Sequence, residues 1–134
     1  MDSPLHRHRL IVPFGDTDAS GWMHFPNVFR YVEAAEHEFL RVSGLLVFDR
    51  GQGGWPKVHV DCDYKRPLLT GDEIEVQVAV SRVGAAAVNW AFEVWKAGEL
   101  SSSGSFVTVR VGPDGRPMEI DESTRTILLR EGQG

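Results

Sequence analysis

The sequence predicts an α+β domain in which one long central helix is wrapped by a five-stranded antiparallel sheet. The segment that follows Pro26 repeats apolar residues at steps of three and four, which is typical of a helix with one buried face. Segments before and after it alternate apolar and polar residues, which is typical of strands. One helix cannot cover both faces of such a sheet, so a sheet curved around the helix is the economical way to bury its apolar stripe. The 134 residues suit a single domain, 1–134.

Local signals set the expected limits of the first strand and of the helix. His6–Phe14 favours a strand, and a turn rich in small and acidic residues follows it. Pro26 suits the first helical position, where a missing N–H leaves no hydrogen bond unmade, and Gly44 ends the helix. The apolar residues of the predicted helix face are Val28, Tyr31, Val32, Ala35, Phe39 and Val42.

Four more strands are predicted after the helix, joined by short turns. Their segments are Lys57–Lys65, Glu73–Val80, Val88–Val94 and Leu100–Val111. The first of them is predicted to place four side chains on one face, namely Val58, Val60, Cys62 and Tyr64. The glycine-rich stretch Leu45–Trp55 is interpreted as a mobile loop over the mouth of a pocket, and Ile120–Arg130 predicts a short terminal helix.

Composition and charge exclude several classes of protein. The formal net charge is −5 and there is no basic run, which argues against nonspecific binding of nucleic acid. No apolar stretch approaches the roughly 18 residues that span a bilayer, and the first residues lack the apolar core of a signal peptide. The single cysteine, Cys62, cannot form an intrachain disulfide. We therefore expect a cytoplasmic protein that acts on neither nucleic acid nor membrane.

Two carboxylates stand just before the predicted helix. Asp16 and Asp18 are two residues apart in the turn. A helix N-terminus offers unpaired N–H groups and a partial positive charge to an oxygen that develops negative charge. A carboxylate beside such a terminus therefore forms a plausible catalytic pair with it. Because Asp-x-Asp turns also precede helices for purely structural reasons, the spacing alone leaves both interpretations open.

The residues around this turn resemble a known enzyme family. Asp-Thr-Asp-Ala-Ser-Gly, followed by His-Phe-Pro-Asn and by a helix that contains Tyr-Val-Glu-Ala-Ala-Glu, is similar to the 4-hydroxybenzoyl-CoA thioesterase branch of the hotdog-fold acyl-CoA thioesterases. The resemblance runs from about Leu10 to Val111. It implies the hotdog fold and the hydrolysis of an acyl-CoA thioester to a free acid and CoA. It also implies that the second acidic residue of the turn, Asp18, is the catalytic carboxylate, acting either as nucleophile or as general base.

The same resemblance implies roles for the residues around Asp18. Backbone N–H groups near the helix start would bind the thioester carbonyl oxygen, and the candidates for this oxyanion and substrate site are Gly21, Trp22, His24, Phe25 and Asn27. His24 can also titrate near neutrality, so a catalytic role and a place in the pocket wall both stay open. Asp16 is expected to shape the turn. Glu33, on the helix, is the fallback for the catalytic carboxylate.

Partners follow from the resemblance as well. Two subunits of such proteins join their sheets edge to edge with the acyl-CoA along the interface, so a homodimer or a homotetramer is expected. His59 could reach a ligand across that interface, and Arg82 is the candidate for the CoA phosphates. No cofactor is expected, because CoA is part of the substrate. No metal is expected either, because the alternating His6 and His8 lack a third ligand.

Other functions remain open from the sequence. A non-catalytic protein that binds an acyl or aromatic ligand would keep the fold without turnover. A thioesterase could also act on acyl carrier protein in place of CoA, although a chain at −5 offers an acidic carrier little electrostatic steering. The helix motif of hotdog hydratases and dehydratases is not found. We therefore favour acyl-CoA hydrolysis.

Overall fold

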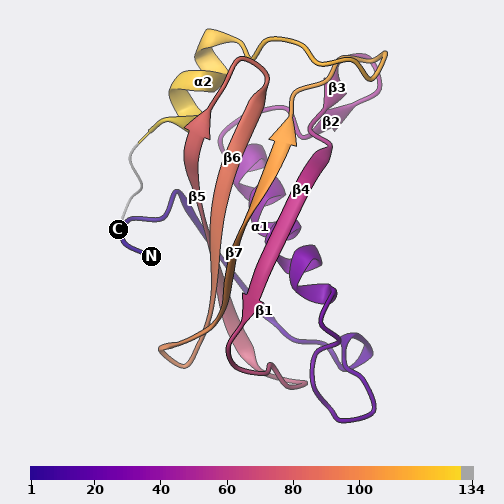
Figure 1. Ribbon diagram of the computed structural model, residues 1–134, viewed down its shortest axis with the longest axis vertical. Helices are drawn as coiled ribbons and strands as arrows, with labels where there is room; N and C mark the ends of the chain where they lie inside the picture. Colours follow the sequence, from indigo (N-terminus) through magenta and orange to yellow (C-terminus); the bar gives the residue numbers. More distant parts are fainter. Residues whose placement is uncertain (131–134) are drawn as a thin grey trace.

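A five-stranded antiparallel sheet forms the main layer of the protein. The computed structural model describes residues 1–130, and the strands lie in the order β1-β5-β6-β7-β4 (Figure 1). Their bounds are β1 His6–Ile11, β4 Lys57–Tyr64, β5 Glu73–Val83, β6 Ala87–Lys96 and β7 Glu99–Val109. Two of the strands, β1 and β4, are therefore the free edges. The predicted α+β class, with a five-stranded antiparallel sheet and a helix packed on it, is confirmed.

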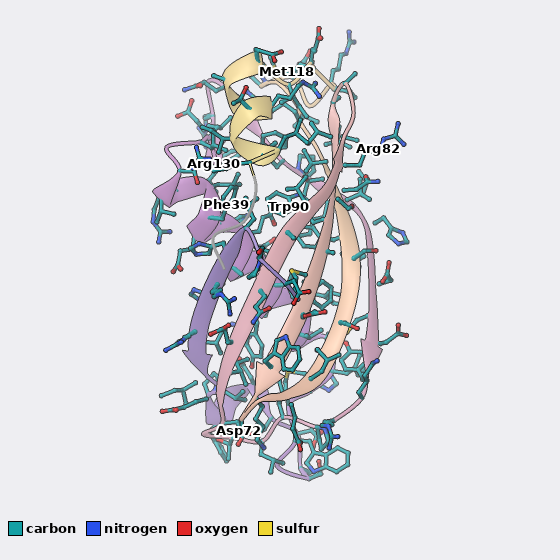
Figure 2. The ribbon with its side chains drawn as sticks, turned by 90° about the vertical axis from the view of Figure 1, so that its left-hand side faces the viewer. Phe39, Asp72, Arg82, Trp90, Met118 and Arg130 are labelled. Carbon is teal, nitrogen blue, oxygen red and sulfur yellow. The ribbon has the colours of Figure 1, made fainter. Side chains whose placement is uncertain are left out.

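The helix α1 (Asn27–Val42) lies against one face of the sheet, and the core lies between them (Figure 1). Phe39 of α1 meets Trp90 of β6 edge-on, with the ring centroids 6.0 Å apart (Figure 2). The helix ends as predicted, because Gly44 has a φ of 72° and its neighbour Leu45 donates to the Leu40 carbonyl at 2.8 Å. Pro26 stands one position earlier than predicted, as the residue that precedes the helix.

The terminal helix and the glycine-rich loop complete the architecture. The helix α2 (Glu122–Leu128) begins at Asp121, whose side chain accepts a hydrogen bond from the Thr124 N–H at 2.7 Å. The glycine-rich loop contains a small hairpin that was not predicted, with strands β2 (Phe48–Asp49) and β3 (Gly53–Gly54). This loop lines a pocket, as expected, and its mobility remains a prediction. Within residues 1–130 no helix is long and apolar enough to cross a membrane.

The prediction that Val58 shares a face with the other apolar residues of β4 is wrong. Lys57 lies opposite Thr108 of β7 and His59 lies opposite Val107, so the register shifts between them and Val58 has no partner residue. The side chain of Lys57 contacts α1 instead. Val58 is 63% exposed. This bulge carries a charged side chain to the helix-covered face of the sheet.

Asp16, the last residue of the single helical turn η1 (Phe14–Asp16), connects the turn between β1 and α1 to the helix. The Asp16 carboxylate accepts hydrogen bonds from the Tyr31 hydroxyl and from the Arg30 guanidinium, both at 2.8 Å. Its backbone carbonyl accepts from the His24 N–H at 2.8 Å and from the Asn27 side chain at 2.9 Å. Asp16 itself is buried. The Tyr31 hydroxyl and the Arg30 guanidinium hold the pKa of Asp16 below its usual value against the opposing effect of burial.

We predict that Asp16→Asn lowers the free energy of unfolding by about 1–3 kcal/mol at pH 7. The amide has only one acceptor oxygen and no negative charge, so it cannot replace both hydrogen bonds of the carboxylate. Urea unfolding measures the change. Because the pKa of Asp16 is lower in the folded protein, its contribution is complete above the unfolded pKa of about 4 and disappears as the pH falls through the folded pKa. The difference between wild type and variant should shrink over that range. Asp2→Asn, which changes an exposed carboxylate near the N-terminus, is the control and should leave stability unchanged. Equal effects of the two variants would contradict the prediction.

Candidate active site

Asp18 lies in a tight turn between η1 and α1. Its Oδ1 accepts hydrogen bonds from the Ser20 hydroxyl and from the Ser20 N–H, the latter at 2.8 Å. The turn is closed by its backbone, since the Asp18 N–H donates to Trp22 at 2.8 Å and Gly21 takes a φ of 83°. Within residues 1–130 the second oxygen, Oδ2, has no hydrogen-bond partner, and the side chain is exposed. Asp18 therefore presents a free carboxylate oxygen to solvent.

The charge state of Asp18 suits a nucleophile or a base. The Ser20 hydroxyl and the Ser20 N–H stabilise the ionised form and hold the pKa of Asp18 below its usual value. His24 adds a smaller electrostatic contribution that also lowers the pKa of Asp18. The carboxyl group is consequently ionised at neutral pH.

Of the five candidate residues near the start of α1, one has a backbone N–H with no acceptor among residues 1–130. The other four candidates already donate within the turn: Gly21 to the Asp18 carbonyl at 3.0 Å, Trp22 to the Ser20 hydroxyl at 3.3 Å, His24 to the Asp16 carbonyl at 2.8 Å and Asn27 to the His24 carbonyl at 3.0 Å. In the described part of the chain, the Phe25 N–H has no acceptor. Among these five candidates, Phe25 is therefore the residue whose backbone N–H remains available to a ligand.

Phe25 is held in place by the end of β4. The Tyr64 hydroxyl donates to the Phe25 carbonyl at 2.7 Å, and the two rings meet edge-on with centroids 6.3 Å apart. Burial raises the pKa of Tyr64 to about 12, so the phenol remains a donor at neutral pH. The two residues line a cleft of about 380 Å³ together with Lys65 and Arg66. Sequence analysis did not single out Tyr64, because nothing local shows that the end of β4 meets the helix start.

The remaining candidates are dispersed over the molecule. His59 lies on the face of β4 away from α1, where its ring is 3.1 Å from the Asp61 carboxylate. Glu33 lies on α1 and accepts from Lys57 at 3.1 Å. Arg82 lies near the end of β5 that is farther from Asp72, and its side chain points away from the helix-covered face of the sheet (Figure 2). Since the Asp18 turn lies at the Asp72 end, Arg82 stands roughly 30 Å away along the strand within one protomer.

No group of three or more histidine, cysteine or acidic side chains within residues 1–130 is arranged to hold a metal ion. His6 and His8 instead both contact the Glu38 carboxylate, at 2.7 and 2.9 Å. This cluster connects β1 to α1 on the covered face of the sheet.

Comparison with known proteins identifies the family of the chain. The family model described as the thioesterase-like superfamily matches residues 12–128. A relative from Parasynechococcus marenigrum, named 1,4-dihydroxy-2-naphthoyl-CoA hydrolase, is 39% identical over 95 residues, which are 62% of this chain and 62% of the relative. The matched region thus spans about three fifths of the length of that relative.

Solved structures agree in fold over nearly the whole chain. A thioesterase from Thermus thermophilus, in complex with coenzyme A and zinc, superposes with a TM-score of 0.82 at 26% identity and covers 96% of this chain and 95% of its own. A gentisyl-coenzyme A thioesterase superposes with a TM-score of 0.83 at 27% identity and covers 92% and 99%. The predicted hotdog fold is confirmed. The arrangement of one helix on a five-stranded sheet and the match over residues 12–128 establish that the chain belongs to the thioesterase-like superfamily.

Proposed function

We propose that the protein is a thioesterase that hydrolyses acyl-CoA to a free acid and CoA, with Asp18 as the catalytic carboxylate. The observation that carries this proposal is that the short segment between η1 and α1 holds both an ionised carboxylate with a free oxygen and an N–H without an acceptor just before the helix start. Membership of the thioesterase-like superfamily supports it, as do relatives named as hydrolases or thioesterases of CoA esters.

The two groups divide the chemistry between them. The thioester oxygen accepts a hydrogen bond from the Phe25 N–H, and the partial positive charge of the α1 N-terminus stabilises the oxyanion that forms. One such donor is worth roughly 3–4 kcal/mol of transition-state stabilisation in enzymes where it has been removed. Asp18 then either attacks the carbonyl carbon, expelling CoA thiolate and leaving an anhydride for water to hydrolyse, or takes the proton of an attacking water. Both routes release the same acid and the same thiol.

A second copy of the chain completes the site in this proposal. The edge strand β4 is exposed along most of its length, including Val58 and Val60 at 63% and 41%, and unpaired edges are normally covered. Antiparallel pairing of β4 with β4 of another copy closes a two-fold dimer. The end that carries Tyr64 then lies near Lys57 of the second copy. A homotetramer would require a further interface between two such dimers.

The nucleotide of CoA is proposed to meet basic side chains near the 380 Å³ cleft. Lys65 and Arg66 line this cleft beside Phe25, whereas Arg82 lies toward the other end of the sheet of the same protomer. Arg66 also forms an exposed ion pair with Glu99 at 3.2 Å, so Lys65 is the better candidate. Arg82 retains a role only if another copy brings it to the cleft.

Asp18→Asn tests the catalytic assignment, because it keeps the shape of the side chain and removes its charge. We expect kcat for acyl-CoA hydrolysis to fall by about 10²–10⁴, with little change in KM or thermal stability. Thiol release with a panel of acyl-CoAs measures the rate. Asp16→Asn is the matched control and should affect kcat less while lowering stability. An Asp18→Asn variant that keeps more than about a tenth of the wild-type kcat would overturn the assignment, and Glu33 or His24 would be tested next.

The wild-type protein tests the alternative functions. Binding of acyl-CoA without release of thiol would indicate a non-catalytic binder, and release of thiol only from acyl carrier protein would identify the carrier protein as the substrate.

The dimer prediction is tested by light scattering at micromolar concentration, which should give at least twice 14.9 kDa. Val60→Lys places two like charges near the proposed two-fold axis, so we expect it to yield a monomer with little activity. Val42→Lys introduces the same charge at an exposed valine of α1 and should remain dimeric. A fully active wild-type monomer would rule out the shared site.

Lys65→Ala should raise KM for acyl-CoA several-fold while leaving kcat nearly unchanged. This pattern is expected when the lost interaction stabilises the bound substrate and the transition state equally. The effect should vanish with an acyl-pantetheine substrate, which lacks the nucleotide. Arg82→Ala provides the comparison. If Arg82→Ala raises KM and Lys65→Ala does not, the phosphate contact belongs to Arg82 of a neighbouring copy.

A further inference from the structure

The hydroxyl of Ser20 has one acceptor among residues 1–130, and that acceptor is the carboxylate of Asp18. Ser20 donates to Asp18 Oδ1 through both its hydroxyl and its backbone N–H, the latter at 2.8 Å. The Oγ of Ser20 in turn accepts from the Trp22 N–H at 3.3 Å. Because this N–H occupies a lone pair of Oγ, the hydroxyl hydrogen is left to point at Asp18. The three groups form a short chain of hydrogen bonds that ends on the proposed catalytic carboxylate.

This chain of hydrogen bonds acts on only one oxygen of the carboxylate. Oδ1 receives both donors from Ser20, whereas Oδ2 of Asp18 has no partner within residues 1–130. A carboxylate on an exposed turn otherwise samples several rotamers, and a reacting group gains when it is held in the orientation that the reaction needs. Two donors on one oxygen restrict the rotation of the group and leave Oδ2 as the atom that can meet a substrate.

The Ser20 hydroxyl is not needed to close the turn itself. The backbone closes it, because the Asp18 N–H donates to the Trp22 carbonyl at 2.8 Å and the Gly21 N–H donates to the Asp18 carbonyl at 3.0 Å. Ser20 is also exposed, so its side chain fills no space in the core. Loss of the hydroxyl is therefore expected to change the carboxylate and not the fold.

We propose that Ser20 is a positioning residue for the thioesterase reaction, in which its hydroxyl holds Asp18 Oδ1 so that Oδ2 faces the thioester carbonyl carbon or the attacking water. The proposal rests on the proposed function, in which Asp18 is the catalytic carboxylate. Ser20 does not contact the reacting atoms in this role and acts only through Asp18.

Ser20 also has the largest influence on the charge state of Asp18. Its hydroxyl is the main cause of the low pKa of Asp18, its N–H follows, and desolvation opposes both. His24 is the titratable side chain that adds an electrostatic contribution. The second carboxylate of the turn, Asp16, is occupied by side chains of α1. Removal of the Ser20 hydroxyl should therefore raise the pKa of Asp18 towards its usual value.

Ser20→Ala tests the role through the rate and its pH dependence. At pH 7 we expect kcat for acyl-CoA hydrolysis to fall by about 2- to 10-fold, the factor that corresponds to one net hydrogen bond, with KM and melting temperature unchanged. A carboxylate that only became more basic would react faster, so a lower kcat indicates lost orientation. The acid limb of kcat/KM should move to higher pH, because the ionised form loses a donor.

Two matched variants separate this role from a structural one. Ser20→Thr keeps the hydroxyl at an exposed position and should keep the wild-type kcat and acid limb. Thr17→Ala removes a hydroxyl of the same turn that donates to the Phe14 carbonyl at 2.7 Å, and it should also leave both unchanged. Equal kcat and equal acid limbs in Ser20→Ala and the wild type would overturn the proposal.

A His24→Gln background separates the acid limb of Asp18 from the titration of His24. The shift caused by Ser20→Ala should persist in this background. A shift that disappears there would assign the limb to His24 and contradict the proposal.

A measurement without turnover distinguishes failure of this proposal from failure of the proposed function. The carboxyl carbon of Asp18, assigned by comparison with Asp18→Asn, is followed by carbon NMR as the pH changes. The midpoint should be higher in Ser20→Ala than in the wild type or in Thr17→Ala. Equal midpoints would refute the hold of Ser20 on Asp18 and leave the thioesterase function standing. A wild-type protein that releases no thiol from any acyl-CoA would refute the proposed function, and with it the role of Ser20 in catalysis, even if the midpoints differ.

Discussion

The carboxylate of Asp16 is the interaction on which the arrangement of the proposed site depends. It accepts from Tyr31 and Arg30 of α1, while its own backbone carbonyl receives the His24 N–H. These contacts join the turn to the helix at several points, which fixes where the helix N-terminus lies relative to Asp18. An oxyanion donor is effective only when it is oriented before the reaction, because no reorganisation is then needed in the transition state. The buried carboxylate next to the proposed catalytic one thus has a structural task that the exposed one lacks.

The hydrogen bonds of the turn also explain why a single N–H remains for a substrate. Each N–H group that closes the loop already donates to an acceptor within it. Among the five candidates, only the Phe25 N–H has no acceptor within residues 1–130, where the chain passes from loop to helix. Tyr64 then binds the carbonyl of the same residue, so the peptide that carries the donor is held from the β4 side. The donor and the exposed carboxylate are held by different contacts, the first by Tyr64 and the second by Ser20.

The edge strand β4 connects two separate features of the molecule. One end of this strand holds Phe25 and the other end carries Lys57 into the pocket that the glycine-rich loop lines. In the proposed dimer, antiparallel pairing of β4 with β4 of a second copy would bring the Phe25 end of one copy near the Lys57 end of the other. Within its own chain, Lys57 pairs with the buried Glu36 of α1. A buried lysine–glutamate pair is a weak source of stability, but it is a suitable way to hold one charge in a fixed place.

The sequence by itself determined the class of fold, the limits of α1 and the turn that carries Asp16 and Asp18, because these depend on short-range periods, on a glycine at the helix end and on a local motif. It did not determine which side chains face the helix at the start of β4, since the bulge beside Lys57 arises only when β4 is aligned with β7. Nor did it show that Phe25 keeps a free N–H or that Arg82 stands at the far end of the sheet from Asp18. Hydrogen-bond satisfaction and strand register are set by partners distant in the chain, so only the tertiary structure decided them.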